Sequence, residues 1–391
     1  MKKKLIFITE ALWIGGIETA LVNLLNRLDY DRYEVTCLIL RDSQELAGRL
    51  PPQCRLLVAD RQHAVSFPET YQYKRLYNLM EEPQHTSRLR RLIWQLLCLV
   101  LRGPEARRYA AYVRQQLNGE HFDTAVIYSD RTAETAVRAI SADKFLMFYH
   151  HGAMRREYHD ELGYRRAEKV IVVSESLAEK LKAYRPRYAE KIIAINNLID
   201  IEGVRRKSLE APKIVFRKDQ FNIVSCGRLS PAKGMDLAVE ACGLLVQRRL
   251  KDVHWWIVGG GPEEERLRQQ ITRLGLGAYI TLLGMQENPY PYIRQADMYV
   301  QPSRFEAYGL TIAEAKVLGV PVLSTETDGG KELIINGIDG LLCQPDAPSI
   351  ANGAERLHRD SAFRQRFQQT QAEHDFEEDN ASILQRLDTL F

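Results

Sequence analysis

Short apolar runs alternate with amphipathic stretches along most of this chain, and that alternation restricts the fold more than any other feature. Residues 5–8, 33–40, 122–128 and 144–149 are apolar runs of strand length. After the first of them, a Gly-Gly turn leads into apolar residues that recur at helical spacing over 17–28. Strands separated by helices pair in parallel, with helices on both faces of the sheet. We therefore predict an α/β chain whose opening segment starts a doubly wound sheet.

The same alternation restarts in the second half of the chain. Residues 200–219 are charged and lose the pattern, and strand-like runs return at 221–226, 253–258 and 280–283. A length of 391 residues also suggests two domains. We predict a first domain over 1–200, a linker over 201–219, a second domain over 220–370, and a C-terminal helix over 371–391 that packs back on the body. Two such domains facing each other would form a cleft.

Composition narrows the classes of function. The formal net charge of +3 is too small to favour nucleic acid as a partner. The six cysteines are scattered without metal-binding spacing, so we expect reduced thiols and a cytoplasmic protein. The apolar run at 5–8 is shorter than the core of a signal peptide, and no stretch reaches the length of a transmembrane helix.

The segment 86–117 surrounds an apolar run, 92–101, with seven arginines and a single acidic residue. The arginines are Arg88, Arg90, Arg91, Arg102, Arg107, Arg108 and Arg114. A basic helix with Trp and Leu is typical of a segment that lies on an anionic membrane surface, which would make the protein peripheral on the inner face of the cell membrane. A helix packed in the first domain with solvated arginines accounts for the pattern equally well.

The stretch 301–334 contains a strand end, a polar turn, a helix start near Tyr308 and Gly309, and a second strand. The first turn of a helix offers unpaired backbone N–H groups and a positive dipole end, which suits a phosphate. Glu306 precedes the helix start and Glu314 lies in its second turn, where carboxylates could accept hydrogen bonds from sugar hydroxyls. The alternative is an ordinary amphipathic helix, because the dipole alone favours acidic residues there.

Two cations follow the strand at 221–226. Arg228 and Lys233 flank a turn at which we expect a helix to open, near Ser230 or Pro231. Two cations beside a helix start form a cradle for a diphosphate. The alternative is that both are solvated loop cations.

Two pairs of residues follow strands of the first half, at the sheet edge where doubly wound proteins bind ligands. Gly15 and Gly16 follow the first strand, and His150 and His151 follow the strand at 144–149. The alternatives are a glycine pair that only permits a tight turn and histidines that are hydrogen-bonded in the surface or core.

Three stretches of the second half occur in the order and at the separations of a known family: CGRLSPAKGMD, VGGGPEEERL and PSRFEAYGLTIAEAKVLGVPVLST. Together they resemble the second domain of the family-4 retaining glycosyltransferases of the GT-B fold. IGGIETALVNLLNRL, YHHG and KVIVVSESLAEKL resemble landmarks of its first domain. The resemblance is strong over 221–345, fair over 5–40 and 144–197, and absent from 41–120. It implies two Rossmann-like doubly wound domains that face a cleft.

The resemblance implies roles for the matching residues of the second domain. Glu306 would contact hydroxyls of the donor sugar, and Glu314 would contact the ribose. Arg228 and Lys233 would bind the diphosphate, together with backbone amides at Tyr308, Gly309 and Leu310. Backbone at Met285 would hold the base.

In the first domain, the resemblance implies that Gly15 and Gly16 approach the phosphates or the sugar. It places His150, or alternatively His151, beside the donor sugar. One departure lies between these groups: Ala307 stands where the family commonly has glycine, so a methyl group would lie close to the donor sugar.

The resemblance implies a retaining transfer from a nucleoside diphosphate sugar, most often UDP-linked, to a hydroxyl of a surface polysaccharide or a lipid-linked acceptor. It implies no metal and no other cofactor. Asp29-Tyr30-Asp31 has the letters of a metal-binding DxD motif, but it lies in a helix-to-strand turn, at the wrong end of the sheet.

Three other functions remain as alternatives. A sugar-nucleotide epimerase or a glycoside phosphorylase could share this fold, and a non-catalytic membrane-associated protein could bind the nucleotide sugar. A nicotinamide-dependent oxidoreductase is disfavoured, because no GxGxxG with its distal acidic residue is present.

Overall fold

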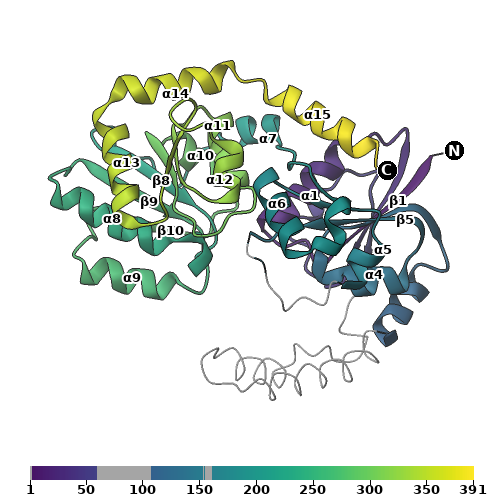
Figure 1. Ribbon diagram of the computed structural model, residues 1–391. Helices are drawn as coiled ribbons and strands as arrows, with labels where there is room; N and C mark the ends of the chain where they lie inside the picture. Colours follow the sequence, from purple (N-terminus) through teal and green to yellow (C-terminus); the bar gives the residue numbers. More distant parts are fainter. Residues whose placement is uncertain (1, 60–106, 153, 155–160) are drawn as a thin grey trace.

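The computed structural model describes residues 2–59, 107–152, 154 and 161–391, and these residues form two parallel α/β units (Figure 1). The first sheet has seven strands in the order β3-β2-β1-β4-β5-β6-β7. Its strands are β1 (Lys3–Thr9), β2 (Tyr33–Ile39), β3 (Arg55–Val58), β4 (His121–Ile127), β5 (Ser141–Tyr149), β6 (Lys169–Val172) and β7 (Ile192–Ala194). Its helices are α1 (Gly16–Arg27), α4 (Ala133–Ala139), α5 (Glu161–Arg166) and α6 (Glu175–Tyr184).

The second sheet has six strands in the order β10-β9-β8-β11-β12-β13. Its strands are β8 (Phe221–Cys226), β9 (Val253–Val258), β10 (Ile280–Gly284), β11 (Met298–Gln301), β12 (Val322–Thr325) and β13 (Leu341–Cys343). Its helices are α8 (Met235–Gln247), α9 (Glu264–Arg273), α10 (Tyr290–Arg294), α11 (Leu310–Val317), α12 (Asp328–Leu333), α13 (Ala347–Arg359) and α14 (Ser361–Glu373). The prediction of two doubly wound sheets is confirmed.

The apolar runs form strands because both faces of each sheet are covered. Successive side chains of a strand point to opposite faces. In β1, Leu5 and Phe7 pack in one hydrophobic cluster, while Ile6 and Ile8 pack in another on the opposite face. All four are buried, as expected of a central strand in a parallel sheet.

Two local predictions were wrong. We predicted no strand over residues 55–58, but β3 pairs there in parallel with β2 at the edge of the first sheet. We also expected a helix to open at Ser230 or Pro231. The structure has a 3₁₀ turn, η5 (Pro231–Lys233), and α8 begins at Met235, because Gly234 adopts a left-handed backbone with φ of +63°.

The end of the chain returns to the first domain. Helix α15 (Phe376–Asp388) leads from the second domain toward the first sheet, where both chain ends lie (Figure 1). Ile383, Leu387 and Phe391 pack in the same cluster as β1 and α1. The ring of Phe391 stands edge-on to those of Phe7 and Tyr33, with centroids 5.9 Å away in each case. Within the expected linker, residues Ile201–Lys207 form a helix, α7.

The predicted basic segment 86–117 falls mainly outside the described residues, which resume at 107. From there to 116 the chain is helical. Tyr109, Ala110 and Val113 are buried in the first-domain core, and Arg107 and Arg114 are exposed. The described end of the segment therefore packs on the protein. In the described part of the chain, no helix combines the length and apolarity needed to cross a bilayer.

Candidate functional site

The loop before α11 is held against the turn before α8, and this contact brings two predicted residues together. The amide of Arg304 donates to the carbonyl of Ala232 (2.8 Å). The guanidinium of Arg304 donates two hydrogen bonds of 2.7 Å to the carboxylate of Asp236. Lys233, in the same turn, forms an ion pair with Glu306 of the same loop.

Two glycines allow the backbone to approach this closely. A Cβ atom on Gly234 would lie 2.0 Å from the carbonyl oxygen of Pro302. Gly309 is the N-cap of α11 with φ of +91°, and a Cβ there would lie 2.8 Å from Ile312. Other residues rarely adopt these left-handed conformations, so the sequence needs glycine at both places.

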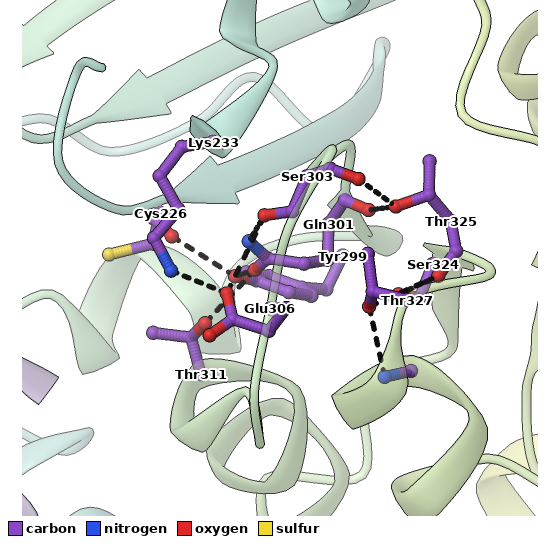
Figure 2. A network of polar contacts seen from close by, with 11 residues as sticks. Cys226, Lys233, Tyr299, Gln301, Ser303, Glu306, Thr311, Ser324, Thr325 and Thr327 are labelled. Atoms are coloured by element: carbon purple, nitrogen blue, oxygen red, sulfur yellow. Dashed lines mark hydrogen bonds and ion pairs between the residues drawn. The ribbon is translucent and has the colours of Figure 1, made fainter. Parts of the chain in front are cut away.

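A chain of buried side chains reaches Glu306 from the end of β11 (Figure 2). The hydroxyl of Thr311 donates to Oε1 of Gln301 (3.0 Å), and that of Tyr299 lies 2.5 Å from the same oxygen and 3.2 Å from the carbonyl oxygen of Cys226. The amide nitrogen of Gln301 donates to Oγ of Ser303 (2.7 Å). The hydroxyl of Ser303 then donates to Oε2 of Glu306 at 3.5 Å, the same oxygen that takes part in the ion pair described above.

Arg228 lies in the turn after β8, and its side chain is exposed. The structure does not bring it into contact with Glu306 as it does Lys233. The turn itself packs on the glycine run at 259–261. The amide of Leu229 donates to the carbonyl of Gly260 (2.9 Å), and a Cβ on Gly259 would lie 1.9 Å from the carbonyl oxygen of Gly227. The glycine run therefore allows two strand ends to pack closely.

Glu314 points into the protein, with only 5% of the residue exposed. The phenol of Tyr290 donates a hydrogen bond of 2.9 Å to its Oε1. Burial is the main cause that raises the pKa of the Glu314 carboxyl to about 7. Burial also raises the pKa of Tyr290, so this phenol keeps its proton and remains a donor. We expected a carboxylate open to a ligand, whereas the structure holds it inside beneath Tyr290.

The remaining predicted donor residues of the second domain differ in exposure. Met285 follows β10 and is 60% exposed, beside Gly260 of the glycine run. Ala307 and Tyr308 are buried against the core of the first domain. Leu310, the first residue of α11, is partly buried against the cores on both faces of the first sheet.

The two predicted histidines lie in different surroundings. His150 stacks on Phe148, and its buried Nε2 atom has no hydrogen-bond partner in the part of the chain that the structure describes. Burial, more than the neighbouring His151, lowers the pKa of His150 to about 3, so its ring is neutral at pH 7. His151 instead pairs through Nε2 with Oδ1 of Asp130 (3.0 Å). Of these two histidines, His150 is the one with a buried ring nitrogen that has no partner among the described residues.

The histidine turn touches the loop of Glu306 directly. Gly152 ends this turn, and a Cβ there would lie 3.2 Å from both the amide nitrogen of Ala307 and the carbonyl carbon of Glu306. Predicted site residues of the first and second domains therefore meet at the domain interface.

The glycine pair of the first domain lies over a buried carboxylate. Gly15 is the N-cap of α1, which begins at Gly16. A Cβ on Gly15 would lie 2.4 Å from Oε2 of Glu18, whose pKa is raised to about 7, chiefly by burial. Glu10, at the end of β1, is also buried and forms an ion pair with Arg41 (2.8 Å). We did not single out these charged side chains from the sequence.

Helix α12 connects the two domains through its carboxylates. Oδ1 of Asp328 accepts hydrogen bonds from the hydroxyl of Ser176 (2.5 Å) and the ammonium of Lys180 (2.6 Å), both on α6. Glu332 accepts from the first amide of α6 (2.9 Å) and from the side chain of Asn196 (2.9 Å). Acidic groups at a helix N-terminus are favoured by its dipole.

The same helix also holds the loop that carries Glu306. The amide of Gly329 donates to the carbonyl of Glu306 (2.9 Å). A Cβ on Gly329 would lie 2.0 Å from the carbonyl oxygen of Tyr308, so the helix and the loop are in direct backbone contact. Helix α12 thus contacts the first domain on one side and the candidate site on the other.

We did not predict Tyr290, Gln301, Ser303, Glu10 or Glu18 as residues of this site. Gln301 and Ser303 alternate at the end of β11 just ahead of Glu306, and this spacing was the available signal. Among the described residues, no group of three His, Cys, Asp or Glu side chains is placed to hold a metal ion. Asp29 and Asp31 lie in the turn before β2, away from the carboxyl edge of the sheet.

Two family models match nearly successive parts of the chain. The model described as Glycosyltransferase Family 4 matches residues 14–202, and the model described as Glycosyl transferases group 1 matches residues 207–374. Among curated proteins, the lipopolysaccharide core biosynthesis glycosyltransferase LpsE of Rhizobium meliloti is 27% identical over 215 residues. That match covers 54% of this chain and 60% of the relative.

A second curated relative comes from Campylobacter jejuni. It is the N-acetylgalactosamine-N,N'-diacetylbacillosaminyl-diphospho-undecaprenol 4-alpha-N-acetylgalactosaminyltransferase, 28% identical over 207 residues. The match covers 52% of this chain and 54% of the relative. The chain thus spans between half and two thirds of the length of these relatives.

Solved structures extend the likeness to the whole chain. Anabaena Alr3699/HepE in complex with UDP-glucose superimposes with a TM-score of 0.71 at 19% identity, covering 99% of this chain and 100% of the other. WaaG, a glycosyltransferase involved in lipopolysaccharide biosynthesis, gives a TM-score of 0.69 at 13% identity, covering 99% of each chain. At these identities the likeness establishes the fold, which is GT-B.

Proposed function

Since the chain belongs to the family-4-like glycosyltransferases of the GT-B fold, we propose that it transfers a sugar from a nucleoside diphosphate sugar to an acceptor hydroxyl, with retention at the anomeric carbon. The observation that carries this proposal is the ion pair of Lys233 with Glu306, in contact with the turn of His150 through Gly152. In this proposal the cation faces the diphosphate, and the carboxylate and the neutral imidazole face the sugar.

We propose a UDP-linked donor. The structures of HepE with UDP and with UDP-glucose support this choice, because they share the fold of this chain. The diphosphate would lie between Lys233, the exposed Arg228 and the first amides of α11, which supply positive charge without a metal ion. Oε1 of Glu306 has no hydrogen-bond partner among the described residues, and it would accept from a hydroxyl of the sugar.

In the proposed step, the bond between the anomeric carbon and the β-phosphate oxygen breaks, and its electron pair goes to the phosphate. The acceptor oxygen attacks the same face, and its proton passes to the departing phosphate. The negative charge that develops on the phosphate is stabilised by Lys233 and Arg228, the kind of electrostatic contribution that is usually the largest in such reactions. His150 is neutral, so it can donate or accept a hydrogen bond without adding charge beside the sugar.

We propose a lipid-linked or polysaccharide acceptor on a membrane surface. The names of the relatives support this, since they include lipopolysaccharide core biosynthesis and a diphospho-undecaprenol acceptor. The exposed Arg107, Arg108 and Arg114 at the described end of the basic segment are available to anionic lipid headgroups. Flotation with phosphatidylglycerol vesicles tests this contact: the protein should float with them, and recovery in the unbound fraction at low salt would exclude it.

A panel of nucleotide sugars scored for UDP release tests the main proposal. At least one UDP-sugar should be turned over in the presence of extracted lipid acceptor, with activity unchanged by EDTA. Lys233→Ala should lower kcat by about 10²–10³, as for removal of one preorganised charge-stabilising group. Lys251→Ala, which removes an exposed lysine of the same domain, is the matched control and should leave kcat unchanged.

The outcomes separate this function from its alternatives. Near-normal turnover in Lys233→Ala would contradict the proposed diphosphate site. An altered sugar nucleotide in place of free UDP indicates an epimerase, and phosphate-dependent release of a sugar phosphate indicates a phosphorylase. Tight UDP binding without any turnover indicates a binding protein.

A further inference from the structure

The buried chain that leads to Glu306 ends at one of its two carboxylate oxygens, Oε2. Ser303 is fully buried and Gln301 is 1% exposed, so neither can contact a substrate. Gln301 nonetheless donates to Ser303, and Ser303 donates in turn to the carboxylate of Glu306 (Figure 2). Their buried polar groups would be costly to leave unpaired, so this arrangement is maintained only if each member keeps its partner.

The direction of the hydrogen bonds is set at the far end. The hydroxyls of Tyr299 and Thr311 both lie within hydrogen-bond distance of Oε1 of Gln301, and Tyr299 also reaches the carbonyl of Cys226, so Oε1 is the accepting atom at this end of the chain. The amide nitrogen of Gln301 must then donate to Ser303. Because the oxygen of Ser303 already accepts this bond, its own proton is free for Oε2 of Glu306.

The result is an asymmetric carboxylate. Oε2 of Glu306 is held by Lys233 and lies 3.5 Å from the hydroxyl of Ser303, and Oε1 has no partner in the described residues. We propose that Ser303 and Gln301 are positioning residues that fix the rotation of the Glu306 carboxylate, so that Oε1 is the oxygen presented to a hydroxyl of the donor sugar. This inference rests on the proposed function. It adds that the selectivity for the sugar, as distinct from the nucleotide, comes from the orientation of the Glu306 carboxylate.

The proposal makes a selective prediction. Ser303→Ala removes the hydroxyl and leaves the diphosphate and base contacts intact. The affinity for UDP should therefore stay the same, and the affinity for UDP-glucose, used here as the probe donor, should fall about tenfold, the effect of about one hydrogen bond. Ser324→Ala is the matched control, because Ser324 is equally buried in this domain but its hydroxyl donates only to the backbone carbonyl of Thr325.

Calorimetric titration of UDP and UDP-glucose into wild type, both serine variants, Glu306→Gln and the double variant Ser303→Ala/Glu306→Gln tests it. If Ser303 acts through Glu306, its removal in the Glu306→Gln background should cause no further loss, since coupled residues are non-additive. Equal weakening of UDP and UDP-glucose, or full additivity in the double variant, would overturn the proposal and indicate a merely structural serine.

A crystal structure of Ser303→Ala provides a readout that needs no ligand. The carboxylate of Glu306 should rotate from the orientation found here, whereas an unchanged carboxylate overturns the inference whatever the protein binds. If the wild type does not bind UDP, that result counts against the proposed function. The positioning role of Ser303 would then be tested by the crystal structure alone.

Discussion

Glu314 should make the protein less stable as the pH rises from 4.5 to about 7, and Glu314→Gln should remove that effect. Its carboxyl is buried in the second domain, and burial raises its pKa from the ordinary 4.5 to about 7. Between these two values the folded state binds a proton that the unfolded chain releases. The free energy of unfolding of the wild type therefore falls as pH rises through this window.

The magnitude follows from the two pKa values. Each pH unit between them corresponds to about 1.4 kcal/mol, so the wild type should lose about 3 kcal/mol from below pH 4.5 to above pH 7. Glutamine has no charge to bury, so the variant lacks this loss. For a domain of this size about 3 kcal/mol corresponds to roughly 6–12 °C in Tm. The difference in Tm between the variant and the wild type should therefore increase by roughly 6–12 °C from pH 4.5 to pH 8.

Calorimetric melting of both proteins across this pH range measures the difference directly. Glu355→Gln is a control of opposite sign, because hydrogen bonds from Arg359 and Arg248 lower the pKa of the Glu355 carboxyl. That variant should be less stable than wild type at pH 7, and the difference should vanish in acid. A Tm difference for Glu314→Gln that does not change between pH 4.5 and pH 8 would refute a carboxyl that is buried in its neutral form.

Two further perturbations test the contact between the domains. Lys180→Ala removes the ammonium that donates to Asp328, so the affinity for UDP-glucose, measured by calorimetry, should fall several-fold. Lys182→Ala is the control: Lys182 pairs with Glu179 of the same helix, so this variant should bind UDP-glucose normally. Gly152→Ala adds a Cβ only 3.2 Å from the 306–307 backbone. If the wild type is active, the variant should release UDP at least about tenfold more slowly, at a nearly unchanged Tm. Wild-type rates in the variant would show that the two loops are not in contact during turnover.

The sheets could be predicted from the sequence because most of their strands contain an apolar run that is covered on both faces. β8 and β9 have the bounds expected from the residues alone. β3 was missed because it is a short edge strand of partly buried residues, which lacks that signal. The start of α8 was misplaced by four or five residues, because a proline can open a helix and also a 3₁₀ turn, and only the backbone of Gly234 decides between them.

The sequence predicted several residues of the candidate site, but not the contacts between them. Glu306 and Lys233 were both identified, but their ion pair depends on the contact of Arg304 with the turn before α8. The burial of Glu314 beneath Tyr290 follows from how α10 and α11 pack, and no local pattern encodes it. Contacts between residues distant in the sequence decide which side chains face a ligand, and these contacts were not available from spacing.

The packing of α15 on the first domain has a consequence for synthesis on the ribosome. Phe391 contacts the rings of Phe7 and Tyr33, and its carbonyl accepts from Lys3, a residue 388 positions earlier. At the usual rates of translation, β1 waits roughly 20–80 s for this partner. The second domain can therefore complete its own core while one apolar side of the first, already covered in part by α1, still lacks the contacts of Ile383, Leu387 and Phe391.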